Sequence, residues 1–267
     1  GINHRFALIT GLGSIFNEGK SRTSKLLLLI VSSLYKVSLF FAKAVMFQNP
    51  DDRALFEQNK IVCPNKSYVV NGSGVDLCFY RFAKPPPKIT FLLLARLLNS
   101  KGVGVYFEAA KILKKRYPKI EFCLAGEIDV LNKDSISRCE LNSWIEGDVI
   151  NYYGQLSDVR PAITDCSVFV LPSFYREGVP RSILEAMSMG KAIITTNTPG
   201  CRETVTDGKN GYLITPQSVP ELVVSMMKFI DNPALVEKMG VKSREMAEIK
   251  YDVHKVNKEM LKIMRIQ

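Results

Sequence analysis

The sequence predicts an α/β fold in two parts, and three observations support this prediction. Residues 85–250 alternate short apolar runs with segments of helical spacing, which is typical of a parallel sheet with helices on both faces. Residues 1–84 hold only three further strand candidates, too few for a full doubly wound domain. Three consecutive prolines at 85–87 form a natural linker. We therefore expect a complete, doubly wound, Rossmann-like domain at 85–250 and a partial Rossmann-like domain at 1–84.

The individual elements follow from the spacing of the apolar residues. Continuous apolar runs predict strands at residues 4–10, 44–49, 67–71, 89–95, 120–126, 149–154, 167–172, 191–196 and 211–215. Apolar residues at helical spacing predict helices at residues 102–116, 136–146, 219–231, 234–250 and 253–266. We expect the terminal segment, residues 251–267, to pack back on the first part of the chain.

The run Leu26–Ala42 is nearly apolar and leaves three interpretations open. A membrane-spanning helix needs about 20 apolar residues. This run is shorter and carries Lys36 in its middle. The other two interpretations are a helix in the protein core and a helix lying on a membrane surface. In the latter, Lys25, Lys36 and Lys43 would lie at the lipid headgroups.

Net charge and composition indicate which kinds of ligand and metal site the protein can have. The net charge is +10 and the pI about 9.3, so we expect an anionic partner such as phosphate groups, an anionic membrane face or nucleic acid. No basic stretch interleaved with aromatic residues supports nucleic acid. With two histidines and no D-x-D or H-E-x-x-H motif, we expect no metal site. The six cysteines include no C-x-x-C pair, so we expect the reduced, buried thiols of a cytoplasmic protein.

The stretch GLGSIFNEGKS at 11–21 resembles a phosphate-binding P-loop but does not match it. The motif G-x-x-x-x-G-K-[ST] requires a glycine where this chain has Ser14. We expect the glycines of this stretch to form a tight surface turn instead.

Two cations follow the strand expected at 89–95. Ligands of open parallel sheets bind outside the carboxyl ends of the strands, where Arg96 and Lys101 are expected. A planar guanidinium and an ammonium suit the two phosphates of a diphosphate. Ordinary charges of a solvated loop are the alternative.

Two carboxylates flank the start of a further helix, in the stretch EGVPRSILEAMSMG at 177–190. Pro180 places the first helical residue near Arg181, where free backbone N–H groups and the helix dipole attract an anion. Glu185 lies about one turn inside this helix, and Glu177 lies in the loop before it. A ligand with a diphosphate and many hydroxyl groups, such as a nucleotide sugar, would satisfy both. Acidic residues that merely favour a helix N-terminus are the alternative.

The spacing of these two glutamates, E-x7-E, resembles the donor signature of the retaining glycosyltransferases of family 4, which have the GT-B fold. The whole segment SFYREGVPRSILEAMSMGKAIITTNTPGCRETVTDGKNGYLI resembles this family, as do NGSGVDLCFY, ARLLNSKGV, LAGE and YYG. The stretches GLGSIF and FQNPDDRALF resemble the branch that acts on lipid-linked oligosaccharides in capsule, O-antigen and protein-glycan assembly. The resemblance covers nearly the whole chain.

This resemblance implies an enzyme of surface polysaccharide or glycan biosynthesis. It would move a hexose or N-acetylhexosamine, with retention, from a nucleotide-diphosphate sugar, here expected to be UDP-linked. The acceptor would be a polyprenyl-diphosphate-linked saccharide, and the enzyme would be peripheral on the cytoplasmic face of the cell membrane. The family needs no metal or other cofactor, because fixed cations and a helix end stabilise the leaving diphosphate.

The resemblance also implies a role for each matching residue. Arg96 and Lys101 would hold the donor diphosphate, Glu185 would bind the ribose, and Glu177, the expected catalytic residue, would contact the transferred sugar. Backbone contacts to the sugar and phosphates would come from Gly178, Val179, Arg181 and Ser182. The glycines that would let the backbone approach the cleft between the domains are Gly72 and Gly74.

The chain departs from the family pattern in its first part. The family's first segment, with a glycine-rich loop on the acceptor side, has no counterpart here, so we expect an N-terminally truncated chain. Many members have a histidine where this chain has Thr10 or Gly11. The alternative to an active enzyme is therefore a truncated remnant that binds a nucleotide sugar without turnover.

Overall fold

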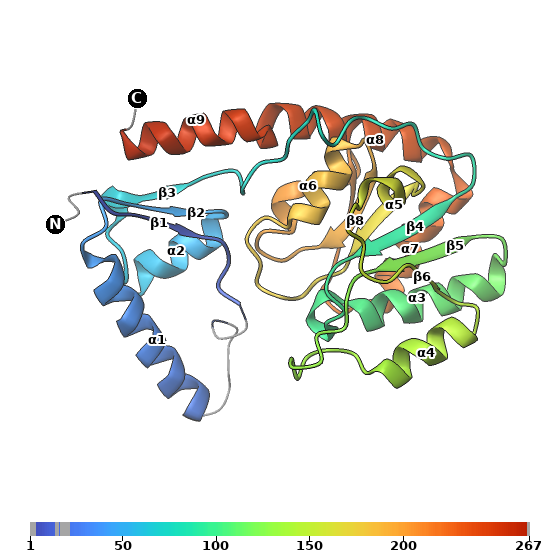
Figure 1. The fold of residues 1–267 in the computed structure, drawn as a ribbon, viewed down its shortest axis with the longest axis horizontal. Helices are drawn as coiled ribbons and strands as arrows, with labels where there is room; N and C mark the ends of the chain where they lie inside the picture. The colour runs from blue at the N-terminus through green and yellow to red at the C-terminus, as the bar shows by residue number, and fades with distance from the viewer. Residues whose placement is uncertain (1–3, 14–15, 17–21, 266–267) are drawn as a thin grey trace.

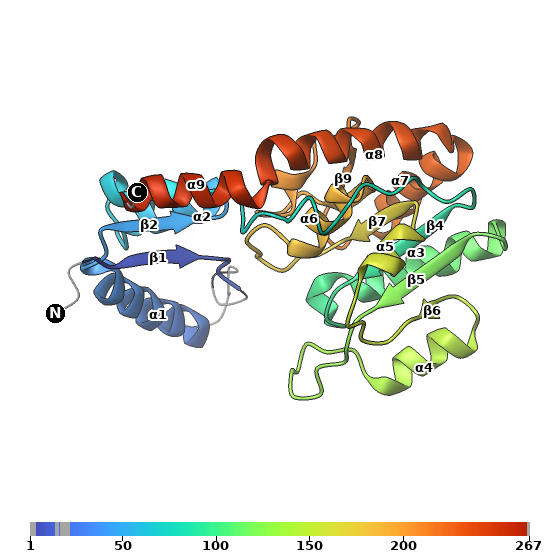
Figure 2. The same ribbon diagram turned by 45° about the horizontal axis from the view of Figure 1, so that its top comes forward.

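The computed structural model describes residues 4–13, 16 and 22–265, which form two parallel β-sheets with helices around them (Figure 1). One sheet comes from residues 6–69 and the other from residues 90–214, with the proline-rich linker between them. The two sheets lie next to each other along the long axis of the molecule (Figures 1 and 2).

The first sheet has three parallel strands in the order β1-β2-β3. Its elements are β1 (Phe6–Ile9), α1 (Arg22–Phe40), β2 (Ala44–Phe47), α2 (Pro50–Gln58) and β3 (Ser67–Val69). β2 is buried along its whole length because it lies in the middle of the sheet. β2 ends at Phe47, and two residues later the side chain of Asn49 accepts a hydrogen bond from Asp52 N–H and so caps α2.

The second sheet has six parallel strands in the order β6-β5-β4-β7-β8-β9. Its strands are β4 (Thr90–Leu94), β5 (Glu121–Ala125), β6 (Asn151–Tyr152), β7 (Val168–Leu171), β8 (Ala192–Thr196) and β9 (Gly211–Ile214). The helices associated with it are α3 (Val103–Arg116), α4 (Arg138–Glu146), α5 (Arg160–Thr164), α6 (Arg181–Ser188), α7 (Val219–Asp231) and α8 (Ala234–Met246). The chain builds outward from β4 in one direction and then from β7 in the other, so the strand order reverses between these two strands.

Alternate residues of the central strands face two separate cores. Phe91 and Leu93 of β4 pack in the core that includes α3 and α7, whereas Leu92 and Leu94 pack in the core that includes α6. β7 divides its residues between the cores in the same way. Both faces of the sheet are therefore covered, as continuous apolar strands predict.

Helix α1 is apolar on two opposite faces. On the inner face, Leu28, Val31, Tyr35 and Leu39 pack against the core around β1 and β2. The exposed apolar residues of the outer face are Leu26, Leu27, Leu29, Ile30, Leu34, Val37 and Phe40. Of the interpretations left open by the sequence, a core helix therefore describes only the inner face of α1. Within the residues that the structure describes, no helix combines the length and hydropathy needed to cross a bilayer.

The end of the chain returns toward the first sheet. After α8, a π-helical turn (Ala247–Tyr251) leads into α9 (Val253–Met264). Val75 of the linker pairs with this junction: its N–H donates to Tyr251 O at 2.8 Å, and its carbonyl accepts from Val253 N–H at 3.1 Å. From there α9 extends beside the first sheet (Figures 1 and 2).

The expected strands and helices are confirmed, with differences at their ends. β6 is reduced to two residues, and the helix expected at 234–250 changes to a π-helical turn after Met246. Among the six free cysteines, Cys123, Cys166 and Cys201 are buried as expected, whereas the other three are exposed.

The surface turn expected in the stretch 11–21 lies largely outside the described residues. Of its two described glycines, Gly13 does lie in a turn, but both are partly buried against the loop after β7 and do not form a free surface turn. Gly13 N–H donates to Arg176 O at 3.2 Å, and Gly11 forms a β-bridge with Glu177. Both glycines have positive φ, and their lack of a side chain lets the first part approach the loop after β7.

We predict that Gly102→Ala destabilises the protein strongly, whereas Gly104→Ala does not. Gly102 has a φ of 77°, and an added Cβ would lie 2.2 Å from Pro172 O, where the segments after β4 and β7 meet. The strain and the clash should lower the free energy of unfolding by about 3 kcal/mol or more. Gly104 lies in α3 with nothing within 4 Å of an added Cβ, so alanine there should stabilise by about 0.5–1 kcal/mol. Urea denaturation measures both, and equal effects of the two substitutions would contradict the prediction.

Candidate active site

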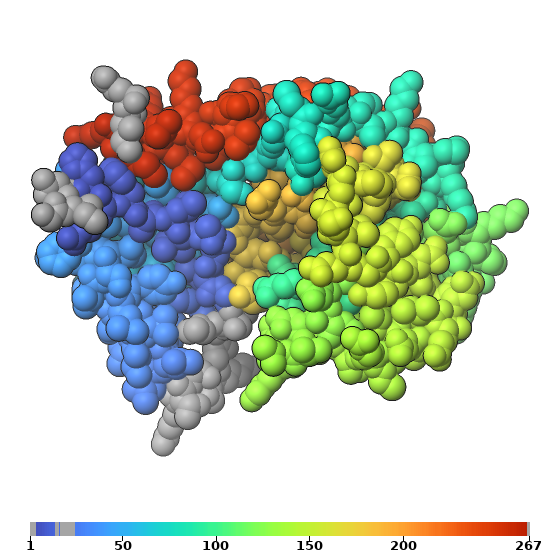
Figure 3. Space-filling view, viewed as in Figure 1, coloured from blue at the N-terminus to red at the C-terminus, as the bar shows by residue number. Residues whose placement is uncertain are grey.

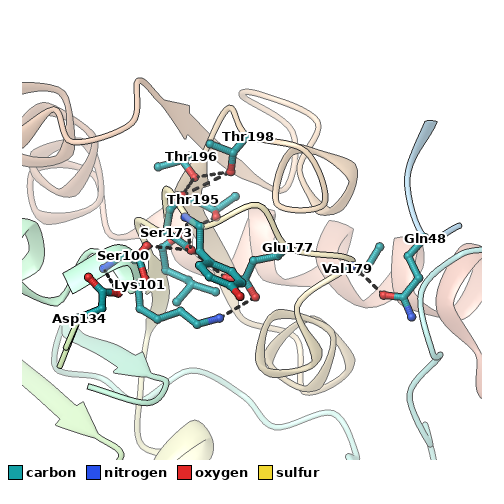
Figure 4. A network of polar contacts seen from close by, with 12 residues as sticks. Gln48, Ser100, Lys101, Asp134, Ser173, Glu177, Val179, Thr195, Thr196 and Thr198 are labelled. Atoms are coloured by element: carbon teal, nitrogen blue, oxygen red, sulfur yellow. Dashed lines mark hydrogen bonds and ion pairs between the residues drawn. The ribbon is translucent and has the colours of Figure 1, made fainter. Parts of the chain in front are cut away.

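An ion pair lies at the point where the strand order of the second sheet reverses. Lys101 follows β4 and Glu177 follows β7, the two strands on either side of the reversal. Lys101 Nζ lies 2.7 Å from Glu177 Oε2, and the two side chains are only 14% and 12% exposed (Figure 4). Ligands of doubly wound sheets bind outside the strand ends at such a switch point. The topology therefore brings together a cation and a carboxylate that are 76 positions apart in the sequence.

Hydrogen bonds within the second part hold both partners of this pair. Ser173, just after β7, donates from Oγ to Glu177 Oε1 at 2.8 Å. On the other side, Ser100 N–H donates to Asp134 Oδ2 at 3.1 Å, so the loop after β5 fixes the turn that carries Lys101 (Figure 4). The carboxylate and the ammonium thus approach each other from two supported loops.

Glu185 lies in α6, the helix that begins four residues after Glu177. No side chain caps the N-terminus of this helix, so its first backbone N–H groups have no side-chain partner there. Burial raises the pKa of Glu185, opposed by a hydrogen bond from Tyr80 and by the charge of Arg181. Burial, together with the nearby Glu185 charge, raises the pKa of Tyr80 to about 12.

A pocket of about 340 Å³ opens beside Glu185. Its lining residues are Ser73, Gly74, Val75, Asp76, Phe79, Tyr80, Arg181, Glu185 and Val253. Two carboxylates (Asp76 and Glu185), one cation and two aromatic rings thus surround a space between the linker and the start of α6. Figure 3 shows a hollow between the two parts of the molecule, with the segment after β7 visible at its bottom.

The remaining residues expected at the site lie in different surroundings. Arg96 is 59% exposed, and its Nη1 lies 3.5 Å from Asp129 Oδ2. Arg181 is exposed at the start of α6, next to Ser182. The structure brings Lys101 and Glu177 into direct contact, and it brings Arg181 to 3.7 Å from Glu185.

One of the expected backbone contacts is occupied by another part of the chain. Val179 N–H already donates to Gln48 Oε1 at 3.0 Å. A Cβ on Gly72 would lie 2.9 Å from Val179 Cβ, and one on Gly74 would lie 2.7 Å from Val253 Cα. Gly72 and Gly74 were expected to let the backbone approach the cleft; in the structure they let it approach Val179 and Val253.

Sequence reasoning missed the side chains that the first part contributes. Gln48 and Asn49 come directly after β2 and contact the loop that carries Glu177. Their signal in the sequence is two amides at the end of an apolar run, in VMFQNPDD. Both are buried, and a buried amide needs hydrogen-bond partners. No group of three or more His, Cys, Asp or Glu side chains suited to hold a metal ion occurs among the described residues.

Comparison with known proteins gives the class. Residues 79–246 match the protein family described as glycosyl transferases group 1. The match covers more than half of the chain, so the protein belongs to this family. A crystal structure of Alr3699/HepE from Anabaena in complex with UDP has the same fold, with a TM-score of 0.79 at 19% identity. That likeness covers 97% of this chain and 71% of the other, and it identifies the fold as GT-B.

Two curated bacterial relatives show what this chain is similar to. One is the N,N'-diacetylbacillosaminyl-diphospho-undecaprenol alpha-1,3-N-acetylgalactosaminyltransferase of Campylobacter jejuni, 29% identical over 98% of this chain and 70% of that protein. The other is the amylovoran biosynthesis glycosyltransferase AmsK of Erwinia amylovora, 23% identical over 78% of this chain and 53% of that protein. The chain thus spans between about half and 70% of the length of these relatives.

We predict that Lys101→Met destabilises the protein and that adding Glu177→Gln restores most of the loss. Methionine leaves the Glu177 carboxylate buried without its cation, which should lower the free energy of unfolding by about 3 kcal/mol. In the double variant no unpaired charge remains. The control is Lys88→Met, which breaks an exposed pair with Glu121 and should cost about 1 kcal/mol or less. Urea denaturation of the double-mutant cycle is the measurement; additive single effects would show that the pair is not coupled.

Proposed function

We propose that this protein is a retaining glycosyltransferase that takes a hexose or N-acetylhexosamine from a UDP-sugar. The proposed acceptor is a polyprenyl-diphosphate-linked saccharide in the biosynthesis of a surface polysaccharide or glycan. Membership of the family supports the reaction class. The Campylobacter relative is named for an undecaprenyl-diphosphate acceptor, and the structural neighbour from Anabaena was solved with UDP.

The observation that carries this proposal is the Lys101–Glu177 pair beside the uncapped N-terminus of α6. A nucleotide-diphosphate sugar presents an anionic diphosphate, a ribose and a sugar within one molecule. A cation, a helix N-terminus and two carboxylates near the switch point offer one partner for each of these groups.

In the proposed arrangement, Lys101 and Arg96 hold the donor diphosphate, and the free N–H groups at Arg181 and Ser182 add to them. As the bond between the sugar and the diphosphate breaks, negative charge grows on UDP and positive charge on the sugar. Lys101 is 2.7 Å from Glu177, so the same ammonium can approach the diphosphate while the carboxylate faces the sugar. Fixed cations of this kind supply the charge stabilisation without a divalent ion, and the proposal includes none.

Glu185 is the proposed partner of the ribose. It is largely buried in α6, and Tyr80 lines the same pocket. Ribose hydroxyls would donate hydrogen bonds to its carboxylate. The adjacent pocket is wide enough for a part of a nucleotide, and it offers the rings of Phe79 and Tyr80 as its apolar walls.

We also propose that the protein is peripheral on the cytoplasmic face of the membrane. The outer face of α1 supports this, because it presents a continuous apolar stripe beside the exposed Lys25, Lys36 and Lys43. Apolar residues on one face with lysines near them are typical of helices that lie in the membrane interface.

We predict that the two glutamates have different effects when changed to glutamine. Glu185→Gln should weaken UDP binding by about 1.5–3 kcal/mol, because it removes charge-assisted hydrogen bonds to the ribose. Glu177→Gln should leave UDP affinity near that of the parent and reduce transfer by about 100-fold or more, because its contacts matter most when charge develops on the sugar. Calorimetry with UDP and an assay of sugar transfer measure the two effects. Glu108→Gln, on the exposed surface of α3, is the control.

The pH dependence of UDP binding gives a second readout for Glu185. Burial raises the pKa of this group, so lowering the pH protonates it earlier than an exposed glutamate. UDP affinity should therefore fall as the pH decreases, and this dependence should disappear in Glu185→Gln.

Two outcomes would contradict the proposed function. If Glu177→Gln transferred sugar at the rate of the parent protein, the proposed role of the Glu177 carboxylate would be refuted. UDP binding without any transfer by the parent would favour a binding remnant.

We predict that the protein sediments with anionic liposomes at low salt and that high salt weakens this association. The double variant Ile30→Glu/Leu34→Glu places two acidic residues on the exposed outer face of α1. It should reduce the bound fraction by about tenfold or more, since it removes apolar area and adds repulsion. Val224→Glu changes an equally exposed apolar residue on α7 and should bind like the parent. Equal binding of both variants would contradict the membrane role of α1.

A further inference from the structure

Residues 48–52, which follow β2 and include the first turn of α2, contact the loop that carries Glu177. We call this segment the 48–52 turn; the loop, residues 176–179, follows β7 of the other sheet. The contacts from the 48–52 turn are to the backbone of the loop and to Arg176, whereas Lys101 and Ser173 hold the carboxylate itself. The loop is thus supported from both sheets at once.

Gln48 reaches the loop through a buried amide. Its Oε1 accepts a hydrogen bond from Val179 N–H at 3.0 Å, and the side chain is 5% exposed (Figure 4). Gly178 makes this approach possible, because an added Cβ would lie 2.1 Å from Gln48 Oε1 and 2.2 Å from Thr10 O. A buried N–H group needs a partner, so Gln48 fixes the loop two residues after Glu177.

Asn49 makes two kinds of contact through its two amide atoms. Oδ1 accepts from Asp52 N–H at 2.8 Å and so caps α2. Nδ2 donates to Asp52 Oδ2 at 3.0 Å and to the backbone carbonyl of Glu177 at 3.2 Å. The side chain is fully buried. A substitution at position 49 that keeps an oxygen acceptor but removes the amide donor would therefore keep the cap of α2 and lose the hydrogen bond to the Glu177 carbonyl.

Two ion pairs join the 48–52 turn to the second part, and one of them involves Arg176 of the same loop. Asp52 Oδ1 lies 2.7 Å from Arg176 Nε, and Asp51 Oδ1 lies 2.9 Å from Arg202 Nη2. Burial raises the pKa of Asp52, while the hydrogen bond and charge of Arg176 oppose this shift. These pairs dock α2 on the second part, and they leave the amides of Gln48 and Asn49 to set the backbone of the loop.

We propose that Gln48 and Asn49 are positioning residues for Glu177, so that the first sheet sets the geometry of a carboxylate in the donor site. The proposal rests on the proposed function in one respect, namely that Glu177 contacts the transferred sugar. Two backbone groups of the loop are paired from the opposite sheet. The loop therefore keeps its working position only while the two sheets are docked, and the acceptor-side part of the fold controls the reactivity of the donor site.

The test compares Asn49→Ser with Asn59→Ser. Serine at position 49 still caps α2, but it lacks the amide that donates to Glu177. Asn59 lies at the other end of the same helix, and its Nδ2 donates to Leu55 O within α2, so it is a matched control. Gln48→Met is the second variant, because it keeps the size of the side chain and removes the acceptor for Val179 N–H.

Four measurements apply to each variant. They are hydrogen–deuterium exchange of the segment 176–179, UDP affinity by calorimetry, the midpoint of thermal unfolding, and the rate of UDP release from UDP-N-acetylgalactosamine as the donor probe. Asn49→Ser and Gln48→Met should each raise exchange in this segment about tenfold and lower turnover about tenfold. UDP affinity and the midpoint of thermal unfolding should stay close to those of Asn59→Ser.

Other outcomes separate this inference from the proposed function. Parent-like exchange and turnover in both variants would overturn it. Faster exchange throughout the protein together with a lower unfolding midpoint would also overturn it, since the 48–52 turn would then only hold the two parts together. A parent protein that binds no UDP would refute the proposed function, while exchange in the segment would still decide whether the 48–52 turn fixes the loop.

Discussion

The ion pair between Lys101 and Glu177 is the contact on which the geometry of the site depends. Two largely buried charges are tolerated only when they are paired, so each side chain must reach the other. They meet because β4 and β7 are neighbours, although 73 residues separate the end of one from the start of the other. Gly102 lets the segments after these strands approach closely. The strand order, the close approach at Gly102 and the buried ion pair thus all occur at the same point, the carboxyl ends of β4 and β7.

The second constraint is the interface between the two sheets. The loop after β7 has its backbone groups paired from the first part and its carboxylate paired from the second. Such an interface requires that every buried polar group finds a partner. Among the described residues, every buried side-chain nitrogen and oxygen atom has one. Small residues make the interface possible, since a Cβ on Gly178 would lie 2.2 Å from Thr10 O. Under the proposed function, such a site would couple donor chemistry to the position of the acceptor-side part, as suits an enzyme that must not release its sugar to water.

The sequence by itself determined the order and type of the elements. Continuous apolar runs such as ITFLLLA can only be buried strands of a sheet covered on both faces, and β4 lies there. Proline has no N–H group, so it disrupts the interior of a helix but is tolerated at its start. Helix α6 accordingly begins at Arg181, directly after Pro180, as predicted. The pair of glutamates and the nearby cations could also be selected, because their spacing and their positions after strands and at a helix start are visible in the sequence. These features are local, and local spacing is what a sequence displays directly.

Only the tertiary structure decided which of these groups act together. Arg96 and Lys101 stand five positions apart, yet Lys101 pairs with Glu177 while Arg96 turns toward Asp129. The sequence left open whether helix α1 lies in the core or at a surface. In the structure one face of α1 packs on the core and the opposite face is apolar and exposed. Gln48 and Asn49 looked like the polar end of a strand, whereas they bond a loop 128 or more positions away. The physical reason is the same in each case: spacing fixes which face of its own element a residue occupies, but hydrogen bonds and ion pairs depend on which elements meet, and that is set by sheet order and by the packing of one part on the other.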